Sequence, residues 1–172
     1  SQFTDEGHKK GLSSMDLPWA KDVYSIGRLD ADSEGLLLFT NNNRLKTQLL
    51  DPDEAHKRTY HVQVEGNPTE AQLEELRRPM TLRIKGKNFV TRGSEAQLID
   101  PEWPPRTPPI RERKSVPDAW LEITLTEGKN RQVRKMTAAV GLPTLRLIRV
   151  AMGPWTLGDL TPGQWKELPP HR

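Results

Sequence analysis

The sequence predicts an α+β protein with a central mixed, mainly antiparallel β-sheet and flanking helices. Residues 58–65 and 120–126 alternate between apolar and polar side chains, which is typical of half-buried strands. Lys85-Gly86-Lys87 separates two short strand-like segments and indicates a tight hairpin. Three helical segments are dispersed among the strands instead of alternating with each one. This order argues against a doubly wound parallel sheet.

Length and composition limit the class of protein. With 172 residues, the chain has room for one domain or for two small, closely packed subdomains. It has no cysteine, which excludes disulfides and thiolate metal sites and fits a cytoplasmic location. No run reaches the roughly 18 apolar residues of a membrane helix, so no membrane partner is expected. Residues 1–20 are polar and predict an irregular N-terminal segment.

The positive charge is concentrated in one part of the chain. Residues 101–150 contain ten basic and five acidic side chains, a net charge of +5. Residues 1–100 contain 14 basic and 16 acidic side chains, a net charge of −2. Most basic residues of the positive segment are arginines, whose fork of N–H donors suits phosphate groups. This distribution favours a polyanionic partner.

A polar turn followed by an apolar run carries the strongest functional signal. The run at residues 36–40 predicts a strand buried on both faces, and the turn before it is bracketed by glycines. Loops held by buried strands are common positions for catalytic residues. The charged residues of the turn are Arg28, Asp30, Asp32 and Glu34. The alternative is a solvated turn in which these side chains pair with one another.

The remaining elements follow in order along the chain. Residues 44–50 predict a short helix that Asp51-Pro52 ends. Thr69 and Gln72 have the spacing of a capping box and begin a second helix. Residues 131–140 predict a third helix, whose apolar stripe consists of Val133, Met136 and Val140. Further strands are predicted at residues 58–65, 81–84, 88–91, 120–126 and 145–152.

Four motifs cover nearly the whole chain. They are Gly27-Arg28-Leu29-Asp30 with residues 31–41, residues 57–62, residues 127–136, and residues 147–150 with 153–160. In sequence and order they resemble the motifs of the RsuA-like family of pseudouridine synthases. The resemblance implies one catalytic domain over residues 1–172, with about eight strands in a central antiparallel sheet and a basic cleft. The RNA-binding domain of the S4 type that many members add is not expected in this chain.

The resemblance assigns roles to four active-site residues. Asp30 corresponds to the catalytic carboxylate, which acts at the ribose as a nucleophile or as a base. Arg134 corresponds to the arginine that pairs with this carboxylate and keeps it ionised and oriented. Tyr60 corresponds to the tyrosine that stacks on the target uracil, and Leu147 to the apolar residue beneath the base. By position alone, Tyr60 and Leu147 would be ordinary core residues.

A second group of residues is expected to contact RNA. Arg28 corresponds to the residue that fills the space left when the target base leaves the stack. The alternative for Arg28 is a salt bridge to Asp32 or Glu34. In and before the third helix, the residues expected to bind RNA are Lys129, Asn130, Arg131 and Lys135.

Residues 100–117 form a proline-rich, basic interruption that the resemblance does not explain. The segment holds six of the 15 prolines and lies between two predicted strands, so it predicts a loop and not a domain linker. We expect it to be poorly ordered in the free protein and to contact RNA beyond the target base. The residues expected to do so are Trp103, Arg106, Arg111, Arg113 and Lys114.

The implied function is the isomerisation of a uridine to pseudouridine in 23S ribosomal RNA, by a monomer. This reaction has no redox step, so we expect no cofactor and no metal. One alternative is a non-catalytic RNA-binding protein or ribosome-assembly factor with the same fold. Another is a metal-dependent nuclease that uses Asp30, Asp32 and Glu34 as ligands.

Overall fold

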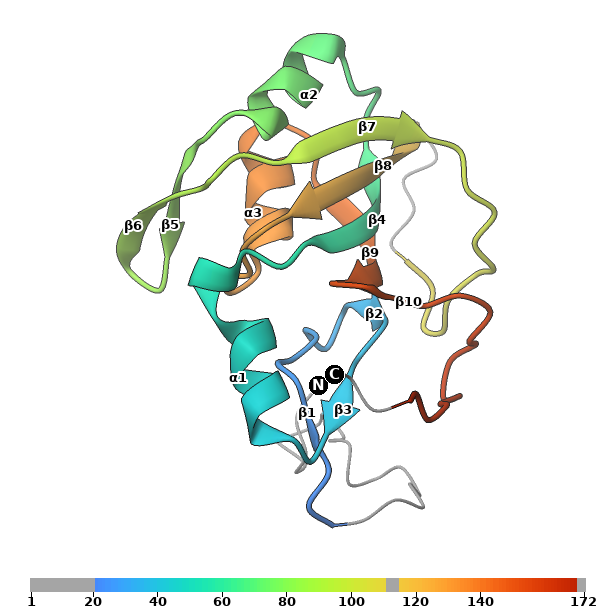
Figure 1. Ribbon diagram of the computed structural model, residues 1–172. Helices are drawn as coiled ribbons and strands as arrows, with labels where there is room; N and C mark the ends of the chain where they lie inside the picture. The colour runs from blue at the N-terminus through green and yellow to red at the C-terminus, as the bar shows by residue number, and fades with distance from the viewer. Residues whose placement is uncertain (1–20, 111–114, 170–172) are drawn as a thin grey trace.

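The computed structural model describes residues 21–110 and 115–169. This part of the chain contains three α-helices and ten strands (Figure 1). The helices are α1 (Asn43–Leu50), α2 (Glu70–Arg77) and α3 (Gln132–Ala139), with a short 3-10 helix at Pro52–Glu54. The strands are β1 (Tyr24–Ser25), β2 (Glu34–Gly35), β3 (Phe39–Thr40), β4 (Arg58–Glu65), β5 (Thr81–Ile84), β6 (Lys87–Val90), β7 (Glu95–Ile99), β8 (Asp118–Leu125), β9 (Thr144–Met152) and β10 (Trp155–Thr156).

Six of these strands form the central sheet. Their order is β10-β9-β4-β8-β7, and β2 pairs with β9 outside this path. The β2–β9 pair is parallel and the other pairs of this sheet are antiparallel. The predicted α+β class with a mixed, mainly antiparallel sheet is therefore confirmed. The expected number of about eight central strands is wrong, because β1 pairs with β3 and β5 pairs with β6 in separate two-stranded sheets.

Strands β4 and β8 place their apolar residues in one core, as their alternation predicts. Val62 and Val64 of β4 and Leu121 and Ile123 of β8 have no exposed surface. The helices add Leu73 and Leu76 from α2 and Val133, Met136 and Val140 at α3 to the same cluster. The sheet is thus covered on this face by α2 and α3, while the opposite face of β4 carries polar residues.

The helix boundaries follow from capping residues. The side chain of Asn42 accepts a hydrogen bond from the backbone N–H of Leu45 and begins α1. The predicted capping box of Thr69 and Gln72 is present at the start of α2. All three predicted helices are confirmed to within one residue at each end. Within the described residues, no helix combines the length and the apolar character needed to span a membrane.

The strand predicted over residues 36–40 is wrong. The segment connects two sheets and contains only the two-residue strand β3. At its start, the backbone N–H of Leu36 donates to the carbonyl of Arg149 on β9 at 2.7 Å. Near its end, the carbonyl of Leu38 accepts from the N–H of Ile26 at 2.7 Å. Because the chain changes its pairing partner between these two bonds, no continuous strand forms, and only Leu36 of the run is buried.

Gly35 permits the close approach of β2 to β9. Its φ is +109°, and a Cβ built on it would lie 2.6 Å from the backbone nitrogen of Arg149. Real Cβ atoms do not come so close to a neighbouring backbone, so only glycine allows this parallel pair. Through this contact β9 holds residues 26–34, the segment that leads into β2, which we call the Asp30 loop.

The hairpin predicted around Lys85-Gly86-Lys87 is confirmed, with β6 beginning one residue earlier than expected. Lys85 and Gly86 link the two strands, with φ values of +49° and +78°. Positive φ at both central residues is the requirement of a type I′ turn, the commonest tight hairpin connection. The hairpin extends sideways from the core of the molecule (Figure 1).

Candidate active site

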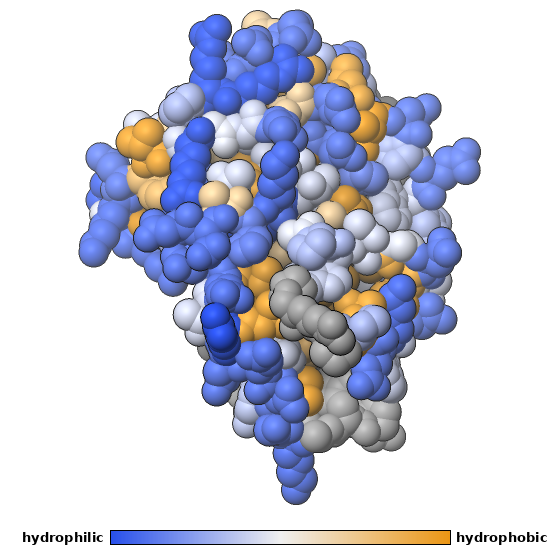
Figure 2. Space-filling view, viewed as in Figure 1, coloured by the Kyte–Doolittle hydropathy of each residue, from blue (hydrophilic) through white to orange (hydrophobic). Residues whose placement is uncertain are grey.

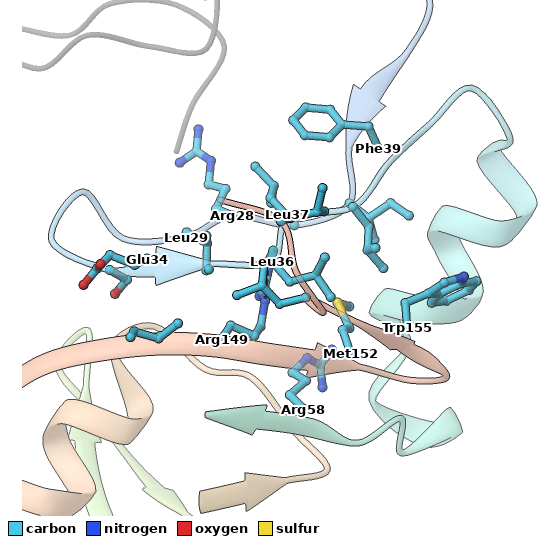
Figure 3. A pocket seen from close by; sticks show the side chains of 18 of the residues that line it. Arg28, Leu29, Glu34, Leu36, Leu37, Phe39, Arg58, Arg149, Met152 and Trp155 are labelled. Carbon is cyan, nitrogen blue, oxygen red and sulfur yellow. Dashed lines mark hydrogen bonds between the residues drawn. The ribbon is translucent and has the colours of Figure 1, made fainter. Parts of the chain in front are cut away.

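The Asp30 loop forms one wall of a cleft with a volume of about 2130 Å³. Figure 3 shows this cleft, with Arg28 and Glu34 on the loop and Arg58 and Arg149 on the strands below it. Residues 128–133 and 154–169 complete the lining. The predicted site residues that line the cleft are Arg28, Asp30, Tyr60, Lys129, Asn130, Arg131 and Leu147. Arg134 and Lys135 lie behind this lining, in α3.

Asp30 lies in a tight turn at the edge of the cleft. Its backbone carbonyl accepts a hydrogen bond from the N–H of Ser33 at 2.9 Å, which closes the turn. Its side chain is 28% exposed, and its Oδ2 lies 3.5 Å from Nη1 of Arg131. That separation is long for a charge-assisted hydrogen bond, so the carboxylate retains space for another group.

Asp32 is held much more tightly than Asp30. Arg131 donates to both of its carboxylate oxygens, from Nη1 at 3.1 Å and from Nη2 at 2.9 Å. This hydrogen bonding lowers the pKa of the Asp32 carboxyl below its ordinary value, although partial burial opposes the shift. The guanidinium of Arg131 therefore lies beside two carboxylates and is hydrogen-bonded to both oxygens of one of them.

Arg134 does not make the contact expected of it. Its Nη2 donates to the backbone carbonyl of Asp32 at 2.9 Å and to Oγ of Ser33 at 3.2 Å. The ion pair predicted between Arg134 and Asp30 is wrong, because Arg131 is the guanidinium within ion-pair distance of Asp30 in the described structure. The reason is that Asp32 and Ser33 lie between Arg134 and the cleft. Arg134 thus supports the Asp30 loop from behind.

Tyr60 and Leu147 lie on neighbouring strands and on the same face of the sheet. Tyr60 of β4 is opposite Arg149 of β9, and Leu147 is opposite Val62. Leu147 is 5% exposed and belongs to the core cluster, against which Tyr60 is partly buried. Both also line the cleft, so the core of the sheet continues directly into its floor. An apolar floor beside a carboxylate suits a planar base that is bound next to its ribose.

The residues expected to bind RNA fall into two groups. Arg28, Lys129 and Asn130 are exposed at the cleft and accessible to a ligand. The alternative for Arg28, a salt bridge to Asp32 or Glu34, is not found in the described structure, because other arginines bind both carboxylates. Lys135 instead donates from Nζ to the backbone carbonyl of Arg83 at 3.0 Å, which ties α3 to the hairpin.

The sequence analysis missed Arg146, which binds Glu34 and so fixes β2. Arg146 is 7% exposed and donates to the two carboxylate oxygens of Glu34 at 2.7 and 2.8 Å. Its Nη1 also donates to the carbonyl of Pro104 at 2.8 Å. Such a buried, bidentate pair has strict geometry. No spacing signal could reveal it, because the partners are 112 residues apart in the chain.

Two further arginines of the cleft floor were missed. Arg149 is 5% exposed; its Nε donates to the carbonyl of Leu36 at 2.9 Å, and its buried Nη2 has no acceptor among the described residues. Arg58 lies half-buried beside Gly128. Burial, together with the charge of Arg149, lowers the pKa of the Arg58 guanidinium. The floor therefore carries positive charge next to Tyr60.

The first part of the proline-rich loop, residues 100–110, is fastened to the protein and not free. Nε1 of Trp103 donates to Nδ1 of His61 at 3.0 Å. Because an indole N–H only donates, this bond assigns the proton of His61 to Nε2, which donates to Glu122 at 3.1 Å. Arg106 donates to the carbonyl of Asp32 at 3.0 Å. For Trp103 and Arg106, the prediction of a poorly ordered segment is wrong; Arg111, Arg113 and Lys114 lie outside the described residues.

The three carboxylates of the Asp30 loop do not converge on a common point. Arg131 binds Asp32 and Arg146 binds Glu34, so both carboxylates are oriented toward guanidinium groups. Within the described residues, no cluster of three or more His, Asp or Glu side chains has an arrangement suited to a metal ion. The geometry therefore gives no support to the nuclease alternative.

Comparisons with known proteins agree with this geometry. The sequence profile of a family described as RNA pseudouridylate synthase matches residues 2–139. A ribosomal large subunit pseudouridine synthase E of Vibrio vulnificus (strain CMCP6) is 51% identical over 169 residues, which cover 98% of this chain and 70% of that protein. A protein of the same name from Xanthomonas campestris pv. campestris is 50% identical over 170 residues, which cover 96% of this chain and 88% of that protein.

A solved structure has the same fold. The crystal structure of a pseudouridylate synthase superposes with a TM-score of 0.75 and 24% sequence identity. The superposition covers 93% of this chain, and this chain spans 62% of that one.

Proposed function

This chain belongs to the RNA pseudouridylate synthase family, and we propose that it isomerises a uridine to pseudouridine in the RNA of the large ribosomal subunit. The names of its relatives from Vibrio vulnificus and Xanthomonas campestris support this class of substrate. More specifically, we propose 23S RNA as the substrate of a cytoplasmic, monomeric protein whose residues 1–172 form one catalytic domain. The substrate RNA is the one partner that the reaction requires.

The observation that carries the proposal is the contrast between the three carboxylates of one loop. Asp32 and Glu34 are each bound by both arms of a guanidinium, whereas Asp30 has one contact at 3.5 Å in the described structure. The loop is therefore held rigidly while the carboxylate that faces the cleft stays available. This arrangement is suited to a nucleophile or a base.

The reaction requires one bond to break and another to form on the same base. The bond between ribose C1′ and uracil N1 breaks, the base rotates, and C1′ bonds to C5. N1 gains a proton and C5 loses one, so the product is an isomer of the substrate. In our proposal Asp30 acts at the ribose, Tyr60 stacks on the uracil, Leu147 packs beneath the base, and Arg134 supports the loop.

The target base must leave its stack before it enters the cleft. Extrusion of a paired or stacked base costs a few kcal/mol, which contacts to the displaced RNA offset. Arg28 is exposed at the cleft and points away from the carboxylate of Glu34 (Figure 3). We propose that its guanidinium occupies the vacated space, with Lys129 and Asn130 on neighbouring phosphates, while Arg131 stays bound to Asp32.

The test is the release of tritium from large-subunit RNA transcribed with [5-³H]uridine, measured with a chelator present. The wild-type protein should release tritium, and Asp30→Ala should release none above background. Asp53→Ala removes an exposed carboxylate of the 3-10 helix and serves as the matched control, with wild-type activity expected. An active Asp30→Ala variant would refute the catalytic assignment. A wild-type protein that binds the RNA without releasing tritium would instead support a non-catalytic RNA-binding protein.

A further inference from the structure

The β5–β6 hairpin carries a concentration of positive charge that the sequence analysis did not recognise. Residues 79–94 contain Arg83, Lys85, Lys87 and Arg92 and no acidic residue. Their charge is hidden when residues 1–100 are counted together, because acidic side chains elsewhere outnumber them. Arg83, Lys85 and Lys87 are all exposed, and the hairpin projects beyond the core (Figure 1). Figure 2 shows hydrophilic side chains at this edge of the molecule.

The hairpin is attached rigidly to the protein. Leu82 and Ile84 of β5 are buried in the same core as α3, and Phe89 of β6 is partly buried against it. Nζ of Lys135 binds the backbone carbonyl of Arg83 at 3.0 Å. A rigid attachment means that charges on the hairpin keep fixed positions relative to α3 and the cleft.

Lys129 connects the hairpin to the cleft. It is exposed, lines the cleft, and its Nζ lies 5.3 Å from the centre of the Phe89 ring. Side chains two residues apart on a strand point to the same face, so Lys87 lies on the face of β6 that carries Phe89. A basic strip thus runs from Lys129 at the cleft to Lys87 and the turn at Lys85.

The strip has no compensating negative charge. In the described structure, Arg83, Lys85, Lys87 and Lys129 form no ion pair with a carboxylate. This contrasts with the arginines behind the Asp30 loop, which are bound to Asp32 and Glu34. Uncompensated, exposed cations on a rigid element are suited to bind a polyanion, because binding releases its counterions.

We propose that the β5–β6 hairpin is a second RNA-binding surface, which contacts backbone phosphates flanking the target nucleotide. This inference deepens the proposed function and rests on it for the identity of the ligand. The contacts would hold the RNA on one side of the cleft while the base is extruded, and they would add affinity without taking part in the chemistry.

The test compares two double variants with equal loss of charge. Lys85→Asn with Lys87→Ser neutralises the strip, and asparagine is chosen because it tolerates the positive φ of residue 85 and favours the type I′ turn before Gly86. Lys21→Ser with Arg44→Ser removes two exposed cations near β1 and α1, away from the hairpin (Figure 1). Binding to large-subunit RNA is measured from low to high salt, and tritium release gives kcat and KM.

The hairpin variant should lower the slope of log Kd against log salt by about 1.4 to 1.8, since each lost phosphate contact removes roughly 0.7 to 0.9. KM should rise and kcat at saturating RNA should stay at the wild-type value, while the control variant leaves the slope nearly unchanged. An unaltered slope, or an equal change in the control, would overturn the proposal. If the slope falls as expected but the wild-type protein releases no tritium, the RNA-binding surface stands and the enzymatic function fails.

Discussion

Arg131 binds the carboxylate of Asp32 through both Nη atoms and lies 3.5 Å from the carboxylate of Asp30. Asp32, and not Asp30, is therefore the carboxylate that ties the loop to Arg131. Asp30, two residues earlier, is the one that we propose for the chemistry. Because Asp32 occupies the hydrogen-bonding fork, Arg131 meets Asp30 only through the longer contact of its Nη1. A substrate group can then approach Asp30 without first displacing a strong hydrogen bond.

This relationship predicts how stability depends on pH. The pKa of Asp32 is lowered from its ordinary value of 3.8, mainly by its hydrogen bonds to Arg131. A lowered pKa contributes stability that is complete above the unfolded value and is lost as the pH falls through the folded value. The free energy of unfolding of wild type should therefore exceed that of Asp32→Asn by about 1 kcal/mol or less, because the pair is partly exposed. Urea titrations should show a constant difference from pH 7 to 5 and a shrinking one below 3.8. A difference in unfolding free energy that increases as the pH falls would contradict this prediction.

A second prediction concerns the support of the loop by Arg134. Arg134→Met removes hydrogen bonds to the carbonyl of Asp32 and to Ser33, so Asp30 should lose its alignment. Misplacement of a catalytic group by about 1 Å costs on the order of 100-fold in rate, and kcat should fall by this factor with RNA affinity little changed. Lys135→Met removes the next charge of the same helix and should retain kcat. An equal loss of kcat in the two variants would mean that the net charge of the helix, and not the alignment of Asp30, is responsible.

A third prediction tests the contact of β2 with β9. Gly35→Ala places a methyl group against the backbone of Arg149, and neither strand can move without breaking the parallel pair. We expect the free energy of unfolding to fall by more than about 3 kcal/mol. Gly86→Ala is the matched control, since φ is also positive there but no atom lies within 4 Å of the added Cβ. Gly86→Ala should lower the free energy of unfolding by only about 1 kcal/mol. Similar losses in the two variants would refute the steric explanation.

A fourth prediction concerns the fastening of the proline-rich loop. Trp103→Phe keeps an aromatic ring but removes the donor to Nδ1 of His61, at a cost of about 1 kcal/mol in stability. A double-mutant cycle with His61→Ala should give a coupling energy of about 0.5 to 1.5 kcal/mol. Turnover should also decrease, because the adjoining Pro104 carbonyl binds Arg146 and so orients Glu34. A coupling energy near zero would mean that the hydrogen bond is not formed in solution.

Local patterns were sufficient to predict most of the fold. The alternation in β4, the capping box of Thr69 and the turn at Lys85 depend on neighbours within a few residues, so the sequence reveals them directly. The interruption of the strand at residues 36–40 depends on Arg149 and Ile26, which approach from two different sheets. No window of sequence around Leu36 contains that information.

The candidate site also combines features that local sequence predicts with features that depend on distant contacts. Short motifs directed attention to Asp30 and Tyr60, and both residues line the cleft. Arg131 was expected to bind RNA, but in the structure it binds Asp32. The arginines that orient the loop were missed or given the wrong partner. Arg146 and Glu34 are 112 residues apart, and Arg134 and Asp32 are 102 residues apart. Which arginine meets which carboxylate is decided by the register of β9 and the position of α3, and both are tertiary properties.

Because β2 pairs with β9, the Asp30 loop can be positioned only after β9 has been synthesised. The Asp30 loop is synthesised before its anchors, because Gly35 packs against Arg149 and Glu34 binds Arg146, more than 100 residues later in the chain. Contacts between such distant segments close large loops of chain and form late in folding. On a translating ribosome, the chain can have its hairpin in place while Asp30, the carboxylate that we propose for the chemistry, is still unpositioned. The proposed activity thus depends on β9, and we expect a nascent chain in which β9 has not yet been synthesised to be inactive toward the RNA around it.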